Sequence, residues 1–158
     1  MTESTQLAPE GLNSSAAASN TAAHPRHRML DNDRASQALG IVVLTADPGH
    51  ARISMVIRED MTNGFDIAHG GMIFALADTC FAMACNHPSR DEGTITVASG
   101  VDINFLKPAL LGETITAEAI EVASTGRSGV YDVTITRGDD LLGVFRGRSR
   151  TIASPGKK

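Results

Sequence analysis

The stretch GMIFALADTCFAMACN, residues 71–86, decides the fold. It is too long for a typical strand and is rich in Ala, Met and Leu, which favour helices. Because the stretch is apolar nearly all round, we expect a helix that is buried on most of its faces. His87 and Pro88 follow directly and predict its end. Asp78 is the one charged residue inside it.

On either side of this helix the chain predicts strands. Apolar residues alternate with polar ones from Arg52 to Arg58, which is typical of a half-buried strand. A short helix, capped within residues 31–33, ends before Gly40. The predicted strands are residues 40–47, 50–58, 94–106, 113–122, 129–136 and 141–152. One buried helix beside a run of antiparallel strands predicts an α+β domain with its sheet wrapped around the helix.

The alternation also assigns faces to three strands. In the strand 94–106 the side chains expected on one face are those of Ile95, Val97, Val101, Ile103 and Phe105. In the strand 113–122 the phase shifts between Ala119 and Ile120, which predicts a β-bulge. In the strand 129–136 the side chains expected to point inward are those of Tyr131, Val133 and Ile135.

Composition narrows the classes of function. The 158 residues are 42% hydrophobic with a formal net charge of −4, which suits one globular domain. An acidic chain argues against nucleic acid and against an anionic membrane as partners. No apolar run approaches the roughly 20 residues that span a bilayer, and the chain does not start like a secretory signal. Cys80 and Cys85 lie about 140° apart around a helix, so we expect two reduced thiols and a cytoplasmic protein.

The start of the chain has low complexity, as in Ser14–Asn20. We therefore predict a disordered tail at residues 1–29, a domain at 30–153 and a short tail at 154–158. His24 and His27 are interpreted as polar tail residues, because two histidines without further ligands rarely form a metal site.

Asp78 needs an explanation, because an unpaired charge in apolar surroundings is destabilising. A structural interpretation pairs it with Arg or Lys from a neighbouring strand. A catalytic interpretation is favoured by His69-Gly70-Gly71 at the predicted helix start. Helix N-termini have free backbone N–H groups and glycine admits close approach, so this segment is suited to polarise a carbonyl. The turn Asn63-Gly64 is expected to line the same opening.

The spacing of these groups has a geometric consequence. Gly70 and Asp78 are eight residues apart, which is about 12 Å along a helix. One reacting carbon cannot touch both groups of the same chain. If both act on it, they come from two chains, which predicts an active site shared across a homodimer.

Several motifs between residues 31 and 152 together resemble one family. They are Asn63-Gly64, His69-Gly70-Gly71, Leu76-Ala77-Asp78-Thr79, Ala84-Cys85-Asn86, Asp102 to Pro108, Gly112-Glu113-Thr114, Gly129 to Asp132, and Phe145 to Ser149. They resemble the hotdog-fold acyl-CoA thioesterases, and within these the PaaI (phenylacetic acid degradation) family. The resemblance implies a hotdog fold, in which five to six antiparallel strands wrap around one long helix.

The resemblance also implies a thioester hydrolase without metal or organic cofactor. It implies a homotetramer that consists of two dimers. It implies that Asp78 acts as nucleophile or general base, that the N–H of Gly70 polarises the carbonyl, and that Asn32 orients the thioester or the water. The implied substrate contacts are Asn63, His69, Gly71 and Thr79. His69 is expected to position its loop and not to act as a base.

Coenzyme A has phosphates that Arg binds well. Residues 146, 148 and 150 are all Arg and alternate along the last strand, so they emerge on one face. Arg150 is interpreted equally as a charge that protects an edge strand. The expected coenzyme A contacts are Lys107, Arg127, Ser128, Arg146 and Arg148. The expected acyl group is small and of the phenylacetyl or hydroxyphenylacetyl type, but residues 65–68 depart from the family pattern and leave this specificity open.

Two other functions on the same fold remain open from the sequence. A dehydratase or hydratase of acyl thioesters needs a His paired with an acid, whereas this helix supplies Asp alone. A non-catalytic acyl-CoA sensor would need an output module, and residues 1–29 show no such pattern. Release of free coenzyme A distinguishes the thioesterase from both alternatives.

Overall fold

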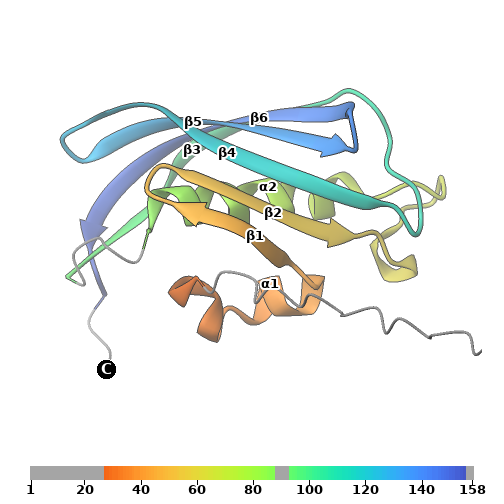
Figure 1. The fold of residues 1–158 in the computed structure, drawn as a ribbon, viewed down its shortest axis with the longest axis horizontal. Coiled ribbons are helices and arrows are strands. Elements are labelled where there is room, and N and C mark those ends of the chain that lie inside the picture. Colours follow the sequence, from red (N-terminus) through yellow and green to blue (C-terminus); the bar gives the residue numbers. More distant parts are fainter. Residues whose placement is uncertain (1–26, 88–92, 156–158) are drawn as a thin grey trace, which may run out of the picture.

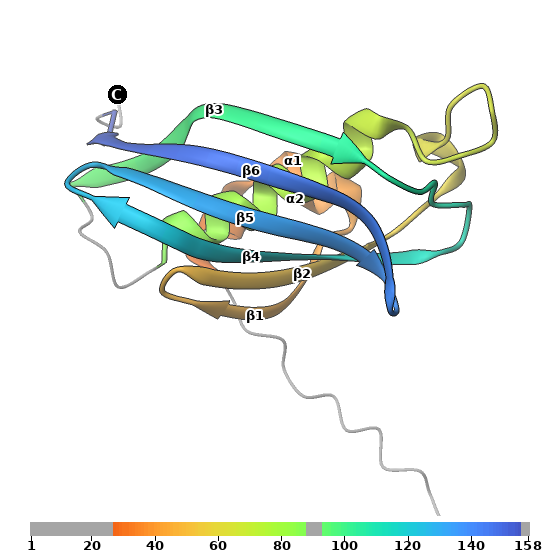
Figure 2. The same ribbon diagram turned by 90° about the horizontal axis from the view of Figure 1, so that it is seen from above.

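The computed structural model describes residues 27–87 and 93–155. Six antiparallel strands form one sheet in the order β1-β2-β4-β5-β6-β3, and this sheet curls around helix α2 (Figures 1 and 2). The strands are β1 (Val42–Asp47), β2 (His50–Val56), β3 (Thr94–Phe105), β4 (Thr114–Thr125), β5 (Ser128–Arg137) and β6 (Asp140–Ala153). The helical elements are η1 (Arg28–Asn32), α1 (Arg34–Leu39), η2 (Glu59–Met61) and α2 (Gly70–Cys85). The predicted α+β hotdog layout is confirmed.

Helix α2 forms the centre of the core. Four of its side chains are 0% exposed, namely those of Leu76, Ala77, Cys80 and Ala84. Because most of these are small, the helix approaches the sheet closely. Gly147 on β6 makes room for Phe81, since a Cβ at position 147 would lie 2.8 Å from the Phe81 ring. That ring meets Tyr131 edge-on, with 5.4 Å between centroids.

Strand β3 differs from the prediction in the faces of its side chains. A bulge lies between Ala98 and Gly100. As a result Thr96 points inward and is 7% exposed, whereas Val97 is 37% exposed. The expectation that Ile95 and Val97 share a face with Val101 and Ile103 is therefore wrong, because a bulge shifts the alternation by one residue.

Strand β4 has a bulge, but two residues later than predicted. The register shifts between Glu121 and Ala123 and not at Ala119. Ile120 is 54% exposed on the outer face, and Glu121 instead continues the inward series. Its carboxylate accepts a hydrogen bond of 2.5 Å from the Tyr131 hydroxyl. The inward orientation of Tyr131, Val133 and Ile135 on β5 is confirmed, since each is at most 1% exposed.

The N-terminal segment packs against the domain earlier than predicted. Asp33 caps α1 by accepting a 3.0 Å hydrogen bond from the N–H of Ser36, and Gly40 ends the helix with a φ of 70°. His27 is only 2% exposed, so its interpretation as a tail residue is wrong. Its Nδ1 accepts a 3.3 Å hydrogen bond from the N–H of Met29. His24 and most of the predicted tails, residues 1–26 and 156–158, lie outside the described residues.

Both cysteines are buried and free, as predicted. The Sγ of Cys80 lies 3.3 Å from the carbonyl oxygens of Ala51 and Ala117, and burial raises the pKa of its thiol to about 12. Among the helices that the structure describes, none has the length and apolar character needed to cross a bilayer.

Candidate active site

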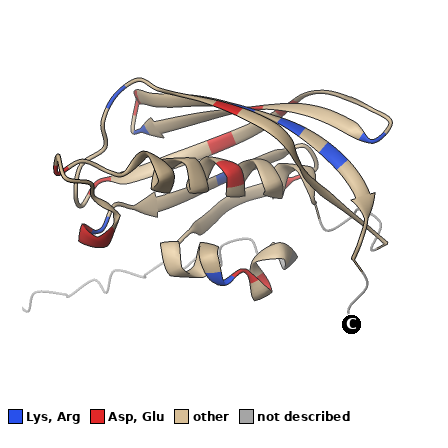
Figure 3. Cartoon of the chain, turned by 180° about the vertical axis from the view of Figure 1, so that it is seen from behind, with Lys and Arg blue, Asp and Glu red and all other residues tan. Residues whose placement is uncertain are grey.

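Asp78 lies on the side of α2 that does not face the sheet. The buried residues of the helix cluster on one side, and Ala75, Asp78, Thr79 and Ala82 form a half-buried stripe on the other. In Figure 3 this helix runs in front of the sheet, and most of its length is free of charge. Burial raises the pKa of the Asp78 carboxyl. Within residues 27–87 and 93–155 no hydrogen bond or ion pair to Asp78 is found, so the structural interpretation lacks its cation.

His69 shapes the N-terminus of α2. Its Nδ1 accepts a 2.9 Å hydrogen bond from the N–H of Gly71, and its own N–H donates to the carbonyl of Met61 at 2.8 Å. The N–H of Gly71 is therefore occupied. For the N–H of Gly70 the described part of the chain supplies no acceptor. Of the two glycine donors, Gly70 is the one available to a ligand.

Asn63 holds the preceding loop in shape. Its Oδ1 accepts a 2.9 Å hydrogen bond from the N–H of Phe65, and its N–H donates to the carbonyl of Ile67 at 2.8 Å. Asp66 completes the turn with a φ of 57°. The Asn63 side chain thus has an architectural function in this loop, and Phe65 is left 85% exposed at its tip.

The predicted site residue Asn32 lies at the end of η1, exposed to solvent. The segment that follows it contacts α2, because the hydroxyl of Ser36 lies 3.4 Å from that of Thr79. The structure therefore brings the Asn32 segment to the helical turn that contains Asp78. The Thr79 hydroxyl itself is directed at α1.

Gly70 and Asp78 belong to one continuous helix of 16 residues. The separation of about 12 Å that the sequence predicts is therefore retained. Phe105, at the end of β3, packs directly over Gly70, and a Cβ at position 70 would lie 3.2 Å from its Cζ. Nothing in the sequence indicates this contact, because the two residues are far apart in the chain and β-strand alternation says nothing about what a side chain touches.

Three of the five predicted coenzyme A contacts are engaged in ion pairs. Arg146 binds both carboxylate oxygens of Asp132 at 2.6 Å, and this holds the pKa of that carboxyl below its usual range. The other two pairs are Arg148 with Asp102 at 2.7 Å and Lys107 with Asp140 at 2.5 Å. All these side chains are substantially exposed, so each pair contributes little to stability.

The five do not form one site within a protomer. The side chain of Lys107 binds Asp140, where β6 begins. Ser128 lies opposite Arg150 in the β5–β6 register, near the other end of β6. Those positions are ten residues apart on β6, or about 33 Å. Arg127 lies with Ser128 at the turn between β4 and β5.

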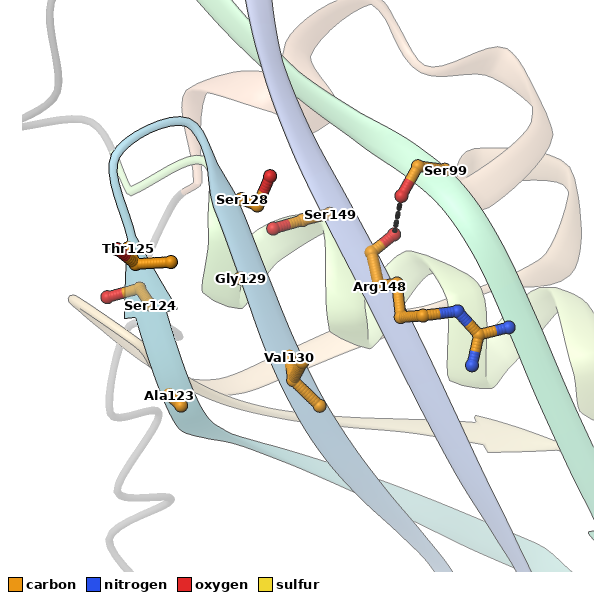
Figure 4. A pocket seen from close by; sticks show the side chains of 9 residues that line it. All are labelled: Ser99, Ala123, Ser124, Thr125, Ser128, Gly129, Val130, Arg148 and Ser149. Carbon is orange, nitrogen blue, oxygen red and sulfur yellow. Dashed lines mark hydrogen bonds between the residues drawn. The ribbon is translucent and has the colours of Figure 1, made fainter.

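A pocket of about 360 Å³ lies beside that turn (Figure 4). Apart from Arg148, the residues that line it are small or have a hydroxyl group: Ser99, Ala123, Ser124, Thr125, Ser128, Gly129, Val130 and Ser149. The hydroxyl of Ser99 donates to the carbonyl of Arg148 at 3.0 Å, and the guanidinium of Arg148 extends away from the other hydroxyls. Sequence reasoning found Ser128 and Arg148 here but missed the remaining hydroxyls. Ser99, Ser124 and Thr125 belong to no motif, and Ser149 ends the Phe145–Ser149 motif, which gives no signal of a pocket.

Potential metal ligands do not gather anywhere in the described part of the chain. Within it no group of three or more His, Cys, Asp or Glu side chains is placed to hold an ion. The chemistry that the site offers is that of a half-buried carboxyl and a free backbone N–H.

Comparisons with known proteins agree on one family. Residues 65–144 match the model of the thioesterase superfamily. Acyl-coenzyme A thioesterase PaaI of Escherichia coli K12 is 41% identical, over 80% of this chain and 88% of its own. The solved structure of E. coli PaaI, from the phenylacetic acid degradation operon, superposes with a TM-score of 0.74, covering 80% of this chain and 89% of that one. A mutant of the phenylacetic acid degradation protein PaaI from Thermus thermophilus superposes with a TM-score of 0.69 at 31% identity, covering 75% and 98%.

Proposed function

Since this chain belongs to the thioesterase superfamily, we propose that it is an acyl-CoA thioesterase that hydrolyses a small aryl-acyl thioester to the free acid and coenzyme A. The observation that supports this most directly is Asp78, a half-buried carboxyl for which the described residues supply no counter-ion. A carboxyl that is half-buried without a counter-ion destabilises the fold, and such groups are typical of catalytic sites. The activity named for the E. coli relative agrees with it.

Two routes are available to Asp78. As a general base, its carboxylate accepts a proton from water while the water oxygen attacks the thioester carbonyl carbon. As a nucleophile, it attacks that carbon itself and forms an anhydride, which water then hydrolyses. In both routes the C–S bond breaks and the departing sulfur takes up a proton. The raised pKa of Asp78 makes its carboxylate a stronger base than an ordinary Asp.

The N–H of Gly70 is proposed to donate to the carbonyl oxygen of the thioester. Negative charge develops on this oxygen as the carbonyl is attacked, so a fixed donor stabilises the transition state by about 3–4 kcal/mol. Because Gly70 and Asp78 are too far apart in one chain, we assign them to two subunits of a homodimer whose α2 helices run antiparallel. Asn32 of η1 is proposed to orient the thioester or the water, and two such dimers to form a tetramer.

The pocket at the turn between β4 and β5 is proposed to receive coenzyme A. Its hydroxyl groups suit the many amides and hydroxyls of that molecule, and Arg127 at the turn suits a phosphate. Arg148 would exchange Asp102 for phosphate at little cost, because their pair is exposed. Arg146 and Lys107 are more firmly held, by two hydrogen bonds and by an ion-pair network respectively. Buried free thiols suit a reducing compartment such as the cytoplasm.

The aryl-acyl assignment rests on the relatives, one of which comes from a phenylacetic acid degradation operon. A panel of phenylacetyl-, hydroxyphenylacetyl-, benzoyl- and acetyl-CoA tests it directly. We expect the wild type to release coenzyme A fastest from the first two. Asp78→Asn should lower turnover by about a hundredfold or more, with the fold intact. No release of coenzyme A from any of the four thioesters, or normal turnover by Asp78→Asn, would exclude the proposal.

A further inference from the structure

The Phe105 ring lies against the donor end of α2. A Cβ at Gly70 would be 3.2 Å from Cζ and 3.5 Å from Cε2 of this ring. A side chain at this position would crowd the ring, which would have to shift by a few tenths of an ångström. The backbone of Gly70 therefore lies close to the Phe105 ring, and a group bound at its N–H comes next to the ring.

Much of this ring remains uncovered by the protomer. Phe105, the last residue of β3, is 52% exposed. Its cross-strand partner on β6 is Gly143, which has no side chain to cover it. On the other side β3 is the edge of the sheet. Phe105 thus lies against Gly70 and still leaves about half of its surface open.

Further apolar groups continue this surface along the helix. Phe74 follows Gly70 by one helical turn, on the same side of α2. Its ring meets Phe145 edge-on with 5.8 Å between centroids, and Phe145 is the cross-strand partner of Ile103 on β3. The nearest cation in sequence, Lys107, is bound to Asp140 instead. The two residues that the structure places next to the Phe105 ring, Gly70 and Gly143, have no charged side chain.

We propose that Phe105 determines acyl specificity, by forming the wall against which the acyl group of the thioester packs when its carbonyl is held by Gly70. This inference rests on the proposed function. A flat, apolar group next to the carbonyl gains most from this wall, because aromatic rings attract each other at centroid separations of about 4.5–7 Å beyond the area they bury. A methyl group in the same place covers little of the ring and gains little.

The test compares Phe105→Ala and Phe105→Leu with Leu111→Ala in the purified full chain. Leu111 is a matched control, because it is an apolar residue of similar exposure, 58%, in the segment that follows β3. The measured quantity is the ratio of kcat/KM for phenylacetyl-CoA to kcat/KM for acetyl-CoA. We expect Phe105→Ala to lower this ratio about tenfold and Phe105→Leu severalfold, while Leu111→Ala leaves it within about twofold.

An unchanged ratio in both Phe105 variants, an equal loss for both substrates, or an equal effect of Leu111→Ala would overturn the inference. Phe105→Leu keeps apolar volume and serves as the decisive variant if Phe105→Ala does not fold. Calorimetry with ketone analogues, in which CH₂ replaces the thioester sulfur, measures the same preference as binding. If the wild type binds these analogues with that preference but hydrolyses no thioester, only the proposed function fails.

Discussion

The hydroxyl of Ser36 lies 3.4 Å from the hydroxyl of Thr79, which joins helix α1 to the helix that contains Asp78. Ser36 also donates a 2.6 Å hydrogen bond to Oδ2 of Asp33, the residue that caps α1. This small polar network holds the segment that begins with Asn32 against α2. Ser36 itself is 2% exposed, and its partners Asp33 and Thr79 are half-buried.

Ser36→Ala should therefore destabilise the protein by about 1 kcal/mol, the usual effect of losing a buried hydrogen bond. A double-mutant cycle with Thr79→Ala isolates the contact between the two hydroxyls, with unfolding in denaturant as the measurement. We expect the double variant to lose less stability than the sum of the single variants. Strict additivity would mean that the two hydroxyls do not interact. A fall in kcat of Ser36→Ala, with KM unchanged, would further connect this network to catalysis through Asn32.

Asp78 should weaken the fold at neutral pH while it serves the reaction. Its pKa is raised by burial, so the folded protein binds a proton more readily than the unfolded chain. The free energy of unfolding is therefore greatest when the Asp78 carboxyl is protonated. It falls as the pH rises through the folded-state pKa of Asp78. Asp78→Asn should raise the melting temperature at pH 7, and the gain should shrink as the pH is lowered through that pKa. A lower melting temperature at pH 7 would indicate a counter-ion, as in the structural interpretation.

How far the sequence predicts this molecule depends on the range of the interactions. The 16-residue helix was predicted to within one residue at each end, because its apolar run is long and leaves one interpretation. The bulge in β3 was missed because it falls in Ala98-Ser99-Gly100, where small residues give no hydrophobic alternation to follow. The sequence does not indicate the burial of His27, because its neighbours in the sequence are polar and no apolar pattern marks the one side chain that packs against the domain.

The candidate site divides in the same way. The pairing of a helix N-terminus with a carboxyl two turns later is local, so spacing alone predicted its geometry. The contact of Phe105 with Gly70 and the separation of Lys107 from Ser128 depend on how β3 and β6 are registered. Register between distant strands is a property of the assembled sheet and has no signature in either strand alone.

His27 should make stability depend on pH. Burial lowers its pKa, and the nearby His87 lowers it further. The unfolded chain therefore binds more protons than the folded protein below about pH 6.5, the ordinary value for His. The contribution of neutral His27 is complete above that pH and is lost as pH falls towards its folded-state pKa. We expect the melting temperature of the wild type to fall more steeply between pH 7 and pH 5 than that of His27→Gln, which cannot titrate. Parallel curves for the two proteins would show that His27 does not take part.

Mixed dimers test whether one active site uses two chains. Asp78→Asn removes the carboxylate from one subunit. Gly70→Val places a side chain against the Phe105 ring and blocks the donor of the other. Each homodimer should be inactive, because both of its sites contain one defect. In a heterodimer both defects fall in one site and the second site is intact, so about half of the wild-type turnover per dimer should return on mixing.

The measurement is thiol release by heterodimers purified through two different affinity tags, with sedimentation to verify their composition. Leu111→Ala in place of Gly70→Val is the control, because that parent should be active before mixing and gain nothing specific from it. If Gly70→Val does not fold, Gly70→Ala is the milder substitution, since its single Cβ would meet only the edge of a flexible ring at 3.2 Å. Verified heterodimers without recovered turnover would place Gly70 and Asp78 in separate reactions, and a fully active monomer would remove the shared site altogether.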